Sequence, residues 1–133
     1  MPVALRLWVA KRKRKALTMR IGLSYRPAVS LSGKKLGILV SAGPEHPNFG
    51  HGTRLAEAAL AQGVDVYLYC IDEAVSGLED ARLGGLFARG LKLYACGYSA
   101  QRRRIPPDPR ATFAGLAALS DLIAATDRFV AFN

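Results

Sequence analysis

Short apolar runs alternate with amphipathic segments over residues 35–133, and this alternation predicts the fold. The apolar runs predict strands at residues 36–40, 64–71, 91–95 and 129–132, and the amphipathic segments predict helices at residues 53–62, 81–89 and 116–125. The first run is apolar throughout, which is typical of a strand buried on both faces of a parallel sheet. Strands that alternate with helices in this way predict an α/β fold, an open parallel sheet flanked by helices with right-handed crossovers.

Capping residues, glycines and prolines mark the boundaries of these elements. Thr53 is a suitable N-cap for the first helix, and Gly63 is a natural residue to follow its end. The glycine- and proline-rich residues 41–52 predict a loop, as do the three prolines within residues 105–109. Two glycines weaken the helix at residues 81–89, because each costs about 1 kcal/mol relative to alanine.

The positive charge of the chain is concentrated at its N-terminal end. The formal net charge is +9 over 133 residues, but residues 1–35 hold ten Lys or Arg and no acidic residue, whereas residues 36–133 hold nine Lys or Arg and ten acidic residues. Residues 1–34 are therefore predicted to be a basic, poorly ordered extension, and residues 35–133 to be one domain. Two alternatives are an arm that binds RNA, DNA or an anionic surface, and a true start at Met19.

The cysteines favour a reducing compartment. Cys70 and Cys96 form neither a CxxC pair nor a disulfide framework, so the cytoplasm is the expected location. Residues 3–10 are apolar but precede the basic run, which reverses the order found in a signal peptide, and they are too short to span a bilayer. No association with a membrane is therefore expected. Cys70 ends an apolar strand without a nearby cation and is expected to be packed.

Ligands of open parallel sheets bind beyond the carboxyl ends of the strands. In this sequence, that edge brings together residues 41–43, 70–73 and 96–99. A thiol, two carboxylates and several small or hydroxyl-bearing residues can therefore meet along one rim. This convergence favours a functional role for the cysteine at the end of the third predicted strand.

Cys96 is the candidate reactive group, because it lies where a strand ends and a short helical turn begins. Gly97 lets the backbone turn, and Ser99 is predicted to be the N-cap of the turn. The N–H groups of a helix start and the cations of residues 102–104 both lower the pKa of a thiol. The alternative is a small buried hydrophobe, since free cysteine is often buried.

The remaining polar residues of this edge give weaker signals. His46 and His51 lack the further ligands that a metal site requires, so no metal site is predicted. The loop around Gly43 matches neither common phosphate-binding motif, and no cofactor is predicted. Asp72 and Glu73 are consistent with an acidic pair at a helix start or with acid–base groups.

Five segments resemble, in order and spacing, the DsrE/DsrF-like family, which includes the TusD-type subunits of sulfur-relay complexes. The resemblance covers residues 35–133 and is carried by SAGPEHP (41–47), TRLAEAAL (53–60), VDVYLYCIDEAV (64–75), LKLYACGYSAQRRR (91–104) and GLAALSDLIAATDRFVAF (115–132). It implies a three-layer α/β fold with a mainly parallel sheet, assembled into trimers or hexamers. It also implies the handling of sulfur through a cysteine persulfide.

The resemblance implies a position for the site. In the family, the sulfur-carrying cysteine follows the strand before an Arg-Arg pair, which corresponds to Cys96 here. The sequence departs from the family at Arg104, where relatives commonly have glycine, and this leaves the conformation of the following turn open. The expected substrate- or anion-binding residues are Gly43, Asp72, Gly97, Ser99, Arg102 and Arg103.

Three functions are consistent with the sequence. The first is a sulfur carrier that takes sulfur from a donor protein as a persulfide on Cys96 and passes it to an acceptor protein. The second is a non-catalytic subunit of the same fold that binds a small anion or a partner protein at an intersubunit cleft. The third, and least favoured, is nucleic-acid binding through residues 1–34.

Overall fold

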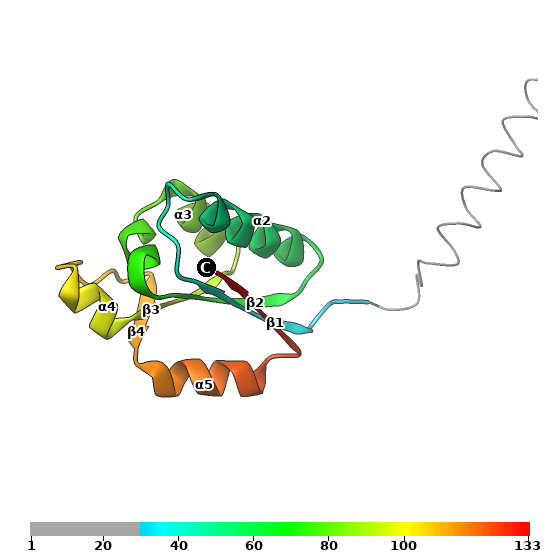
Figure 1. The fold of residues 1–133 in the computed structure, drawn as a ribbon. Helices are drawn as coiled ribbons and strands as arrows, with labels where there is room; N and C mark the ends of the chain where they lie inside the picture. Colours follow the sequence, from blue (N-terminus) through cyan, green and yellow to red (C-terminus); the bar gives the residue numbers. More distant parts are fainter. Residues whose placement is uncertain (1–29) are drawn as a thin grey trace, which may run out of the picture. The chain divides into compact units, whose positions relative to one another are not determined.

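The computed structural model describes residues 30–133, which form a three-layer α/β fold (Figure 1). The strands are β1 (Lys35–Val40), β2 (Asp65–Cys70), β3 (Lys92–Cys96), β4 (Ala111–Ala114) and β5 (Arg128–Phe132). The helices are α2 (Pro47–Ala61), α3 (Ala81–Ala88), α4 (Gly97–Arg102), α5 (Leu116–Ala125) and the 3-10 helix η1 (Asp72–Gly77). No helix within this described region is long and apolar enough to cross a bilayer. The predictions for residues 1–34 fall mainly on residues 1–29 and lie outside the described residues.

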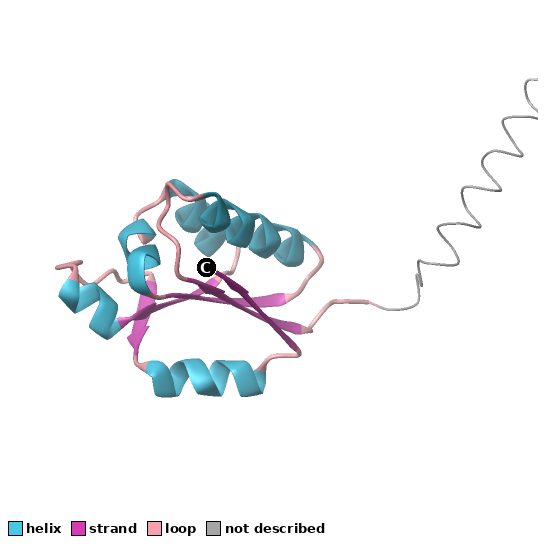
Figure 2. Ribbon diagram, viewed as in Figure 1, coloured by secondary structure: helices cyan, strands magenta, loops and turns pink. Residues whose placement is uncertain are grey.

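All five strands are parallel, and the predicted α/β fold is confirmed. They lie in the order β4-β3-β2-β1-β5, so the chain runs outward from β1 to β4 and then returns to the other side of β1. Because parallel crossovers are right-handed, this reversal places α2 and α3 on one face of the sheet and α5 on the other. Figure 1 and Figure 2 show the two helical layers with the sheet between them. The carboxyl ends of the strands share one edge, where η1 and α4 begin.

Alternate side chains of β2 and β3 enter two different cores. Because successive side chains of a strand point to opposite faces, Cys70 and Tyr69 lie in different cores. Cys70 belongs to the larger core, under α2 and α3, whereas Tyr69 joins Cys96 and Leu122 in the smaller core under α5. The two cysteines therefore occupy opposite faces of the sheet. The partly buried residues around the smaller core are Leu39, Tyr67, Ile71, Tyr94 and Leu119.

Helix α2 begins at Pro47, before the start predicted at Thr53, so the prediction of a loop in this region was wrong over its second half. His46 caps the helix, since its Nδ1 accepts the Asn48 N–H at 3.1 Å, and proline suits the first helical position because its missing N–H would be unpaired there. Gly52 is buried, and a Cβ added to it would lie 2.9 Å from a β1 side chain. A glycine that resembled a loop residue in the sequence therefore allows α2 to pack closely on the sheet.

Strand β4 was not predicted from the sequence. It has four residues, ATFA, which are too few and too weakly apolar to be recognised as a strand. It forms because it pairs with β3, from Leu93 opposite Ala111 to Cys96 opposite Ala114. This strand closes the side of the sheet next to Cys96. The 3-10 helix η1 begins with Asp72 and Glu73, which agrees with their interpretation as an acidic pair at a helix start.

Candidate functional site

Cys96 ends β3 and is the N-cap of the six-residue helix α4. Its backbone is extended (φ −66°, ψ 115°), and its sulfur accepts a hydrogen bond from the Ser99 N–H at 3.5 Å. The prediction that Ser99 is the N-cap was wrong, because Ser99 lies within the first turn of the helix. The Cys96 sulfur therefore occupies the place of the side-chain oxygen that usually accepts at an N-cap.

The hydroxyl of Ser99 connects the ends of two strands. It is buried, with Ser99 only 3% exposed, and it accepts a hydrogen bond at 3.0 Å from the N–H of Asp72, which follows β2. A serine hydroxyl has one proton to donate, and the interaction of this hydroxyl with Cys96 lowers the pKa of the thiol. Ser99 thus favours a charged sulfur through both its N–H, which donates to the sulfur, and its hydroxyl.

Asp72 contributes to this arrangement through its backbone. Its φ of +51° lies in the left-handed region, which is uncommon for a residue other than glycine. In this conformation its N–H donates to Ser99, while Asp72 itself is exposed. Asp72 therefore contributes its N–H group to the hydrogen bonds beside Cys96, and its role in binding a substrate or anion stays a prediction.

The hydrogen bonds around Cys96 favour its thiolate. Burial raises the pKa of the thiol, but the Ser99 hydroxyl and N–H, the Tyr69 hydroxyl and the Tyr98 N–H all lower it. Their combined effect exceeds that of burial, so the pKa of Cys96 lies below its ordinary value. A larger fraction of Cys96 than of an ordinary cysteine is therefore thiolate at neutral pH, and the thiolate is the nucleophilic form.

The sulfur is close to the surface but not on it. Cys96 is 4% exposed, whereas Tyr98 is 66% exposed. Gly97 lies between them and is half-buried, and a Cβ added to it would meet no other atom within 4 Å. The open side of the site is therefore next to Gly97.

Arg103 places a cation beside the site. Its Nη2 donates to Glu73 Oε1 at 2.6 Å, and its Nη1 donates to the Ser99 carbonyl at 3.4 Å. The hydrogen bond with Glu73 raises the pKa of Arg103, with a smaller contribution from the charge of Cys96, and the same bond lowers the pKa of Glu73. This pair links η1 to α4 and keeps the guanidinium near the sulfur.

Two of the predicted site residues are placed elsewhere. Arg102 donates to the Tyr98 hydroxyl at 3.3 Å, and its guanidinium carbon lies 5.7 Å from the centre of that ring, on the exposed side of α4. Gly43 follows β1, which β2 separates from β3, and its carbonyl accepts the His46 N–H at 3.0 Å. The structure thus groups Cys96 with residues that follow β2 and β3 but leaves the end of β1 apart.

Tyr69 was not predicted from the sequence to belong to the site. This residue of β2 is 0% exposed, and its hydroxyl donates to the Ala114 carbonyl at 2.9 Å while also interacting with the Cys96 sulfur. Burial, followed by the charge of Cys96, raises the pKa of Tyr69 to about 12, so it keeps its proton at neutral pH. Because side chains alternate along β2, Tyr69 and Cys70 point to opposite faces of the sheet. Only the register of β2 with β3 shows that Tyr69 lies on the same face as Cys96.

Cys70 has a different environment. It is 0% exposed in the larger core, and burial raises the pKa of its thiol to about 12.

The two histidines make local hydrogen bonds in and before α2. His46 caps α2, and His51 Nδ1 lies 3.1 Å from Asn48 Oδ1. Among residues 30–133, no group of three or more His, Cys, Asp or Glu side chains is placed to hold a metal ion.

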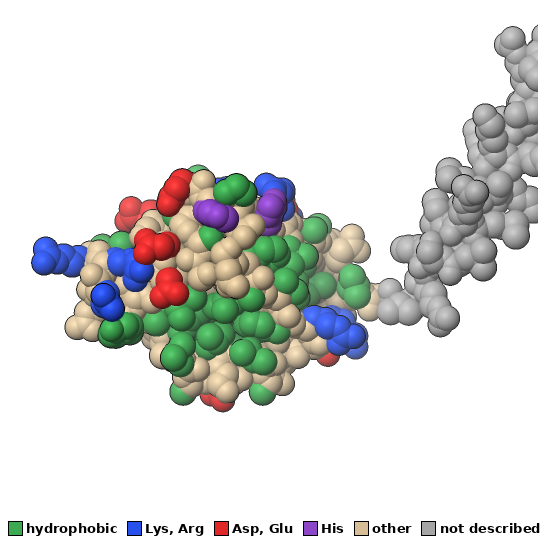
Figure 3. All heavy atoms as spheres, viewed as in Figure 1, with side chains coloured by type: hydrophobic (Ala, Val, Ile, Leu, Met, Phe, Trp, Pro, Cys, Tyr) green, Lys and Arg blue, Asp and Glu red, His purple; other side chains and the backbone are tan. Residues whose placement is uncertain are grey.

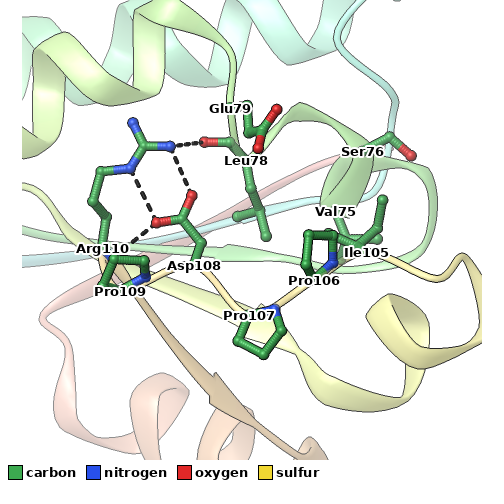
Figure 4. Close-up of a pocket in the computed structure, with 10 residues that line it drawn as sticks. All are labelled: Val75, Ser76, Leu78, Glu79, Ile105, Pro106, Pro107, Asp108, Pro109 and Arg110. Carbon is green, nitrogen blue, oxygen red and sulfur yellow. Dashed lines mark hydrogen bonds and ion pairs between the residues drawn. The ribbon is translucent and has the colours of Figure 1, made fainter.

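A hollow of about 380 Å³ lies between η1 and the proline-rich loop before β4 (Figure 4). Arg110 holds this loop, because its guanidinium donates to the Asp108 carboxylate at 2.7 and 3.0 Å and to the Leu78 carbonyl at 3.1 Å. The lining side chains do not include Cys96 or the residues that donate hydrogen bonds to it. The chemistry of the described region therefore centres on Cys96 and not on this hollow.

Comparison with known proteins agrees with the observed fold. The sequence matches the DsrE/DsrF-like family over residues 34–132. The chain belongs to the DsrE/DsrF-like family. No curated protein matches it.

Two solved structures are similar to this DsrE/DsrF-like chain. The crystal structure of the ychN protein from E. coli matches with a TM-score of 0.66 and 21% identity, covering 75% of this chain and 99% of that chain. A conserved protein of unknown function, BT1422 from Bacteroides thetaiotaomicron, matches with a TM-score of 0.55 and 13% identity, covering 73% of this chain and 94% of that chain. At these identities the two structures support the fold alone.

The structure of this DsrE/DsrF-like protein defines the turn at Arg104. Arg104 has a φ of +54°, and the N–H groups of Arg104 and Ile105 donate to the carbonyls of Gln101 and Ala100 at 3.2 and 2.9 Å. These bonds form a Schellman motif, in which the left-handed position usually holds glycine. The turn therefore has the conformation suited to glycine although this chain has arginine there.

We expect the substitution Arg104→Gly to raise the free energy of unfolding by up to about 1 kcal/mol, because it removes the cost of a left-handed arginine. Arg102→Gly is the matched control. It lies within α4, where glycine should lower the free energy of unfolding by about 1 kcal/mol. Urea denaturation measures both values, and a loss of stability in Arg104→Gly would contradict the assignment of strain to this turn.

We also expect the two cysteines of this DsrE/DsrF-like protein to differ in reactivity. Iodoacetamide should modify Cys96 faster than Cys70 in the folded protein, because the pKa of Cys96 is lowered whereas that of Cys70 is raised to about 12. The rate at Cys96 should rise with pH, with a midpoint below that of free cysteine. Peptide mass spectrometry of samples quenched over a pH series gives both rates, and preferential labelling of Cys70 would refute this expectation.

Proposed function

We propose that this protein is a sulfur carrier of the sulfurtransferase type, which holds sulfur as a persulfide on Cys96. The observation that supports this proposal is the hydrogen bond from the Ser99 N–H to the Cys96 sulfur, which accompanies a lowered pKa of this thiol. A donor to a buried sulfur stabilises a negative charge there, which a structural cysteine does not require. Cys70, in the same sheet, has its pKa raised by burial.

The proposed reaction is thiol exchange without net oxidation. The Cys96 thiolate attacks the outer sulfur of a donor persulfide, R–S–SH, forming the new S–S bond of Cys96–S–SH and releasing R–S⁻. An acceptor thiolate, R′–S⁻, then attacks the same outer sulfur, forming R′–S–SH and returning Cys96 as a thiolate. Both steps require an ionised nucleophile and a stable leaving thiolate. The donors around Cys96 favour its role as the nucleophile in the first step and as the leaving group in the second.

Arg103 has a supporting role in this proposal. Its guanidinium is held by Glu73 and by the Ser99 carbonyl, so it does not pair directly with the sulfur. It therefore contributes positive charge near Cys96 without trapping the sulfur in a tight ion pair. We expect it to attract an anionic persulfide and not to bond to it during transfer.

A non-catalytic binding subunit is the second candidate function. The observation that favours it is the low exposure of Cys96, which is 4% in the single chain. In that function a partner protein or small anion would bind near Gly97 at a cleft between subunits, and Cys96 would react slowly. The pH-dependent labelling of Cys96 separates the two candidates.

The proposal includes donor and acceptor proteins and a location in the cytoplasm, where thiols stay reduced. The two cysteines are both free and lie in different cores, which fits such a location. Both transfer steps take place at the same Cys96 sulfur. Donor and acceptor are therefore expected to use the same side of the molecule, next to Gly97.

We further propose that the protein forms a trimer or hexamer of identical chains. Figure 3 shows hydrophobic side chains gathered across the middle of one face. Leu116, Ile123 and Val130, on α5 and the edge strand β5, are 64%, 49% and 36% exposed. Light scattering coupled to gel filtration should give three or six times the chain mass, and a monomer at micromolar concentration would contradict this proposal.

Sulfur loading tests the main proposal directly. Reduced protein incubated with glutathione persulfide should gain about 32 Da, the mass of one sulfur, on the peptide that contains Cys96. The Cys96→Ala variant should gain nothing there, and dithiothreitol should remove the added mass from the wild type. Cys70→Ala is the matched control and should load like the wild type. No gain on Cys96 in the wild type would rule out the carrier function.

A further inference from the structure

Tyr69 reaches from one strand of the sheet to another that is not its neighbour. It lies in β2, yet its hydroxyl donates to the carbonyl of Ala114 in β4, at 2.9 Å, and β3 lies between the two strands. Ala114 is the register partner of Cys96. The phenol therefore crosses β3 on the face that carries Cys96 and packs in the same core cluster as Cys96, with its oxygen at the Ala114 carbonyl. The interaction with Cys96 contributes to the raised pKa of this phenol.

The hydroxyl of Tyr69 has one proton and two acceptors within reach. Rotation about its C–O bond redirects this proton without moving the ring. While Cys96 is a neutral thiol, the Ala114 carbonyl is the better acceptor, and the phenol oxygen is available to the S–H group. Once the sulfur is charged it becomes the better acceptor, because hydrogen bonds to charged groups are stronger. Tyr69 is 0% exposed, so water does not compete for its proton.

We propose that Tyr69 is a positioning residue whose hydroxyl moves its hydrogen bond from the Ala114 carbonyl to the Cys96 sulfur when that sulfur becomes negatively charged. The thiol proton leaves to solvent, and the Tyr69 proton stays on its own oxygen throughout. The role of this switch in sulfur transfer rests on the proposed carrier function, whereas the switch itself requires only the ionisation of Cys96.

Tyr69 differs in this respect from Ser99. The Ser99 oxygen accepts the Asp72 N–H, and the Ser99 N–H, fixed in the first turn of α4, donates to the Cys96 sulfur. Tyr69 has an alternative partner, so it can follow the charge of the sulfur. The Cys96 thiolate would gain the Tyr69 hydroxyl as a hydrogen-bond donor, which the neutral thiol does not use. A persulfide anion on Cys96 would gain the same donor. The site can therefore stabilise a charged sulfur without holding the uncharged form as tightly.

Titration of Cys96 in the full chain, without any sulfur donor, tests the switch. In Tyr69→Phe, the midpoint of the thiolate absorbance should rise by about 0.5 to 1 pH unit, equivalent to about three- to tenfold less thiolate below the midpoint. Tyr67→Phe is the matched control. Tyr67 lies on the same strand and face, but its hydroxyl faces Lys92 Nζ at 3.5 Å, so its loss should leave the midpoint unchanged.

Replacement of Tyr69 by 3-fluorotyrosine gives an opposite expectation. The fluorinated phenol is a stronger donor of similar size, so it should lower the midpoint, and a residue that served only packing would not reverse the direction of the shift. An unchanged midpoint in Tyr69→Phe, or an upward shift with 3-fluorotyrosine, would overturn the inference. If Tyr69→Phe does not fold, the direction of the 3-fluorotyrosine shift decides. If the wild type takes up no sulfur but both variants show the expected shifts in the Cys96 midpoint, the switch is supported and the proposed carrier function is refuted.

Discussion

The pair of hydrogen bonds at Ser99, from the Asp72 N–H to its hydroxyl and from its own N–H to the Cys96 sulfur, is the interaction on which the site depends. It joins the end of β2 to the first turn of α4. Without the Asp72 N–H, the Ser99 oxygen would be a buried acceptor lacking this partner. Asp72 makes this bond from a left-handed conformation, so backbone strain here accompanies a specific arrangement of donors.

The sheet topology explains why these groups meet. Parallel strands end at one edge, and the order β4-β3-β2 places the Cys96 strand between the strand of Tyr69 and that of Ala114. A single phenol can therefore contact both the sulfur and the opposite strand. The same geometry places Cys70 one layer away, where hydrocarbon surrounds the thiol and burial raises its pKa to about 12. The two cysteines near the same sheet edge thus have pKa values shifted in opposite directions.

Most of the fold could be predicted from the pattern of apolar residues. The runs at β1, β2 and β3 are distinct because strands buried on both faces require continuous apolar sequence. Strand β4 was missed because its stability comes from pairing with β3 and not from its own four residues. The start of α2 was missed because Gly52 has a packing role that is visible only when β1 lies against it.

The site was predictable in position but not in composition. The sequence indicated Cys96 because a cysteine between a strand and a turn, followed by arginines, has a recognisable local pattern. The sequence did not indicate Tyr69. It predicted Arg102 to be a site residue, whereas in the structure Arg102 donates a hydrogen bond to the hydroxyl of the exposed Tyr98. These assignments depend on strand register and on side-chain direction, which residues distant in the sequence determine together.

The sequence by itself determined the α/β alternation, the family and the cysteine at the end of the third predicted strand, because each depends on residues close together in the chain. Only the tertiary structure decided which groups donate to that sulfur and which charges surround it. The physical reason is that a hydrogen bond requires atoms from different strands to come within about 3.5 Å, and no local pattern specifies that distance.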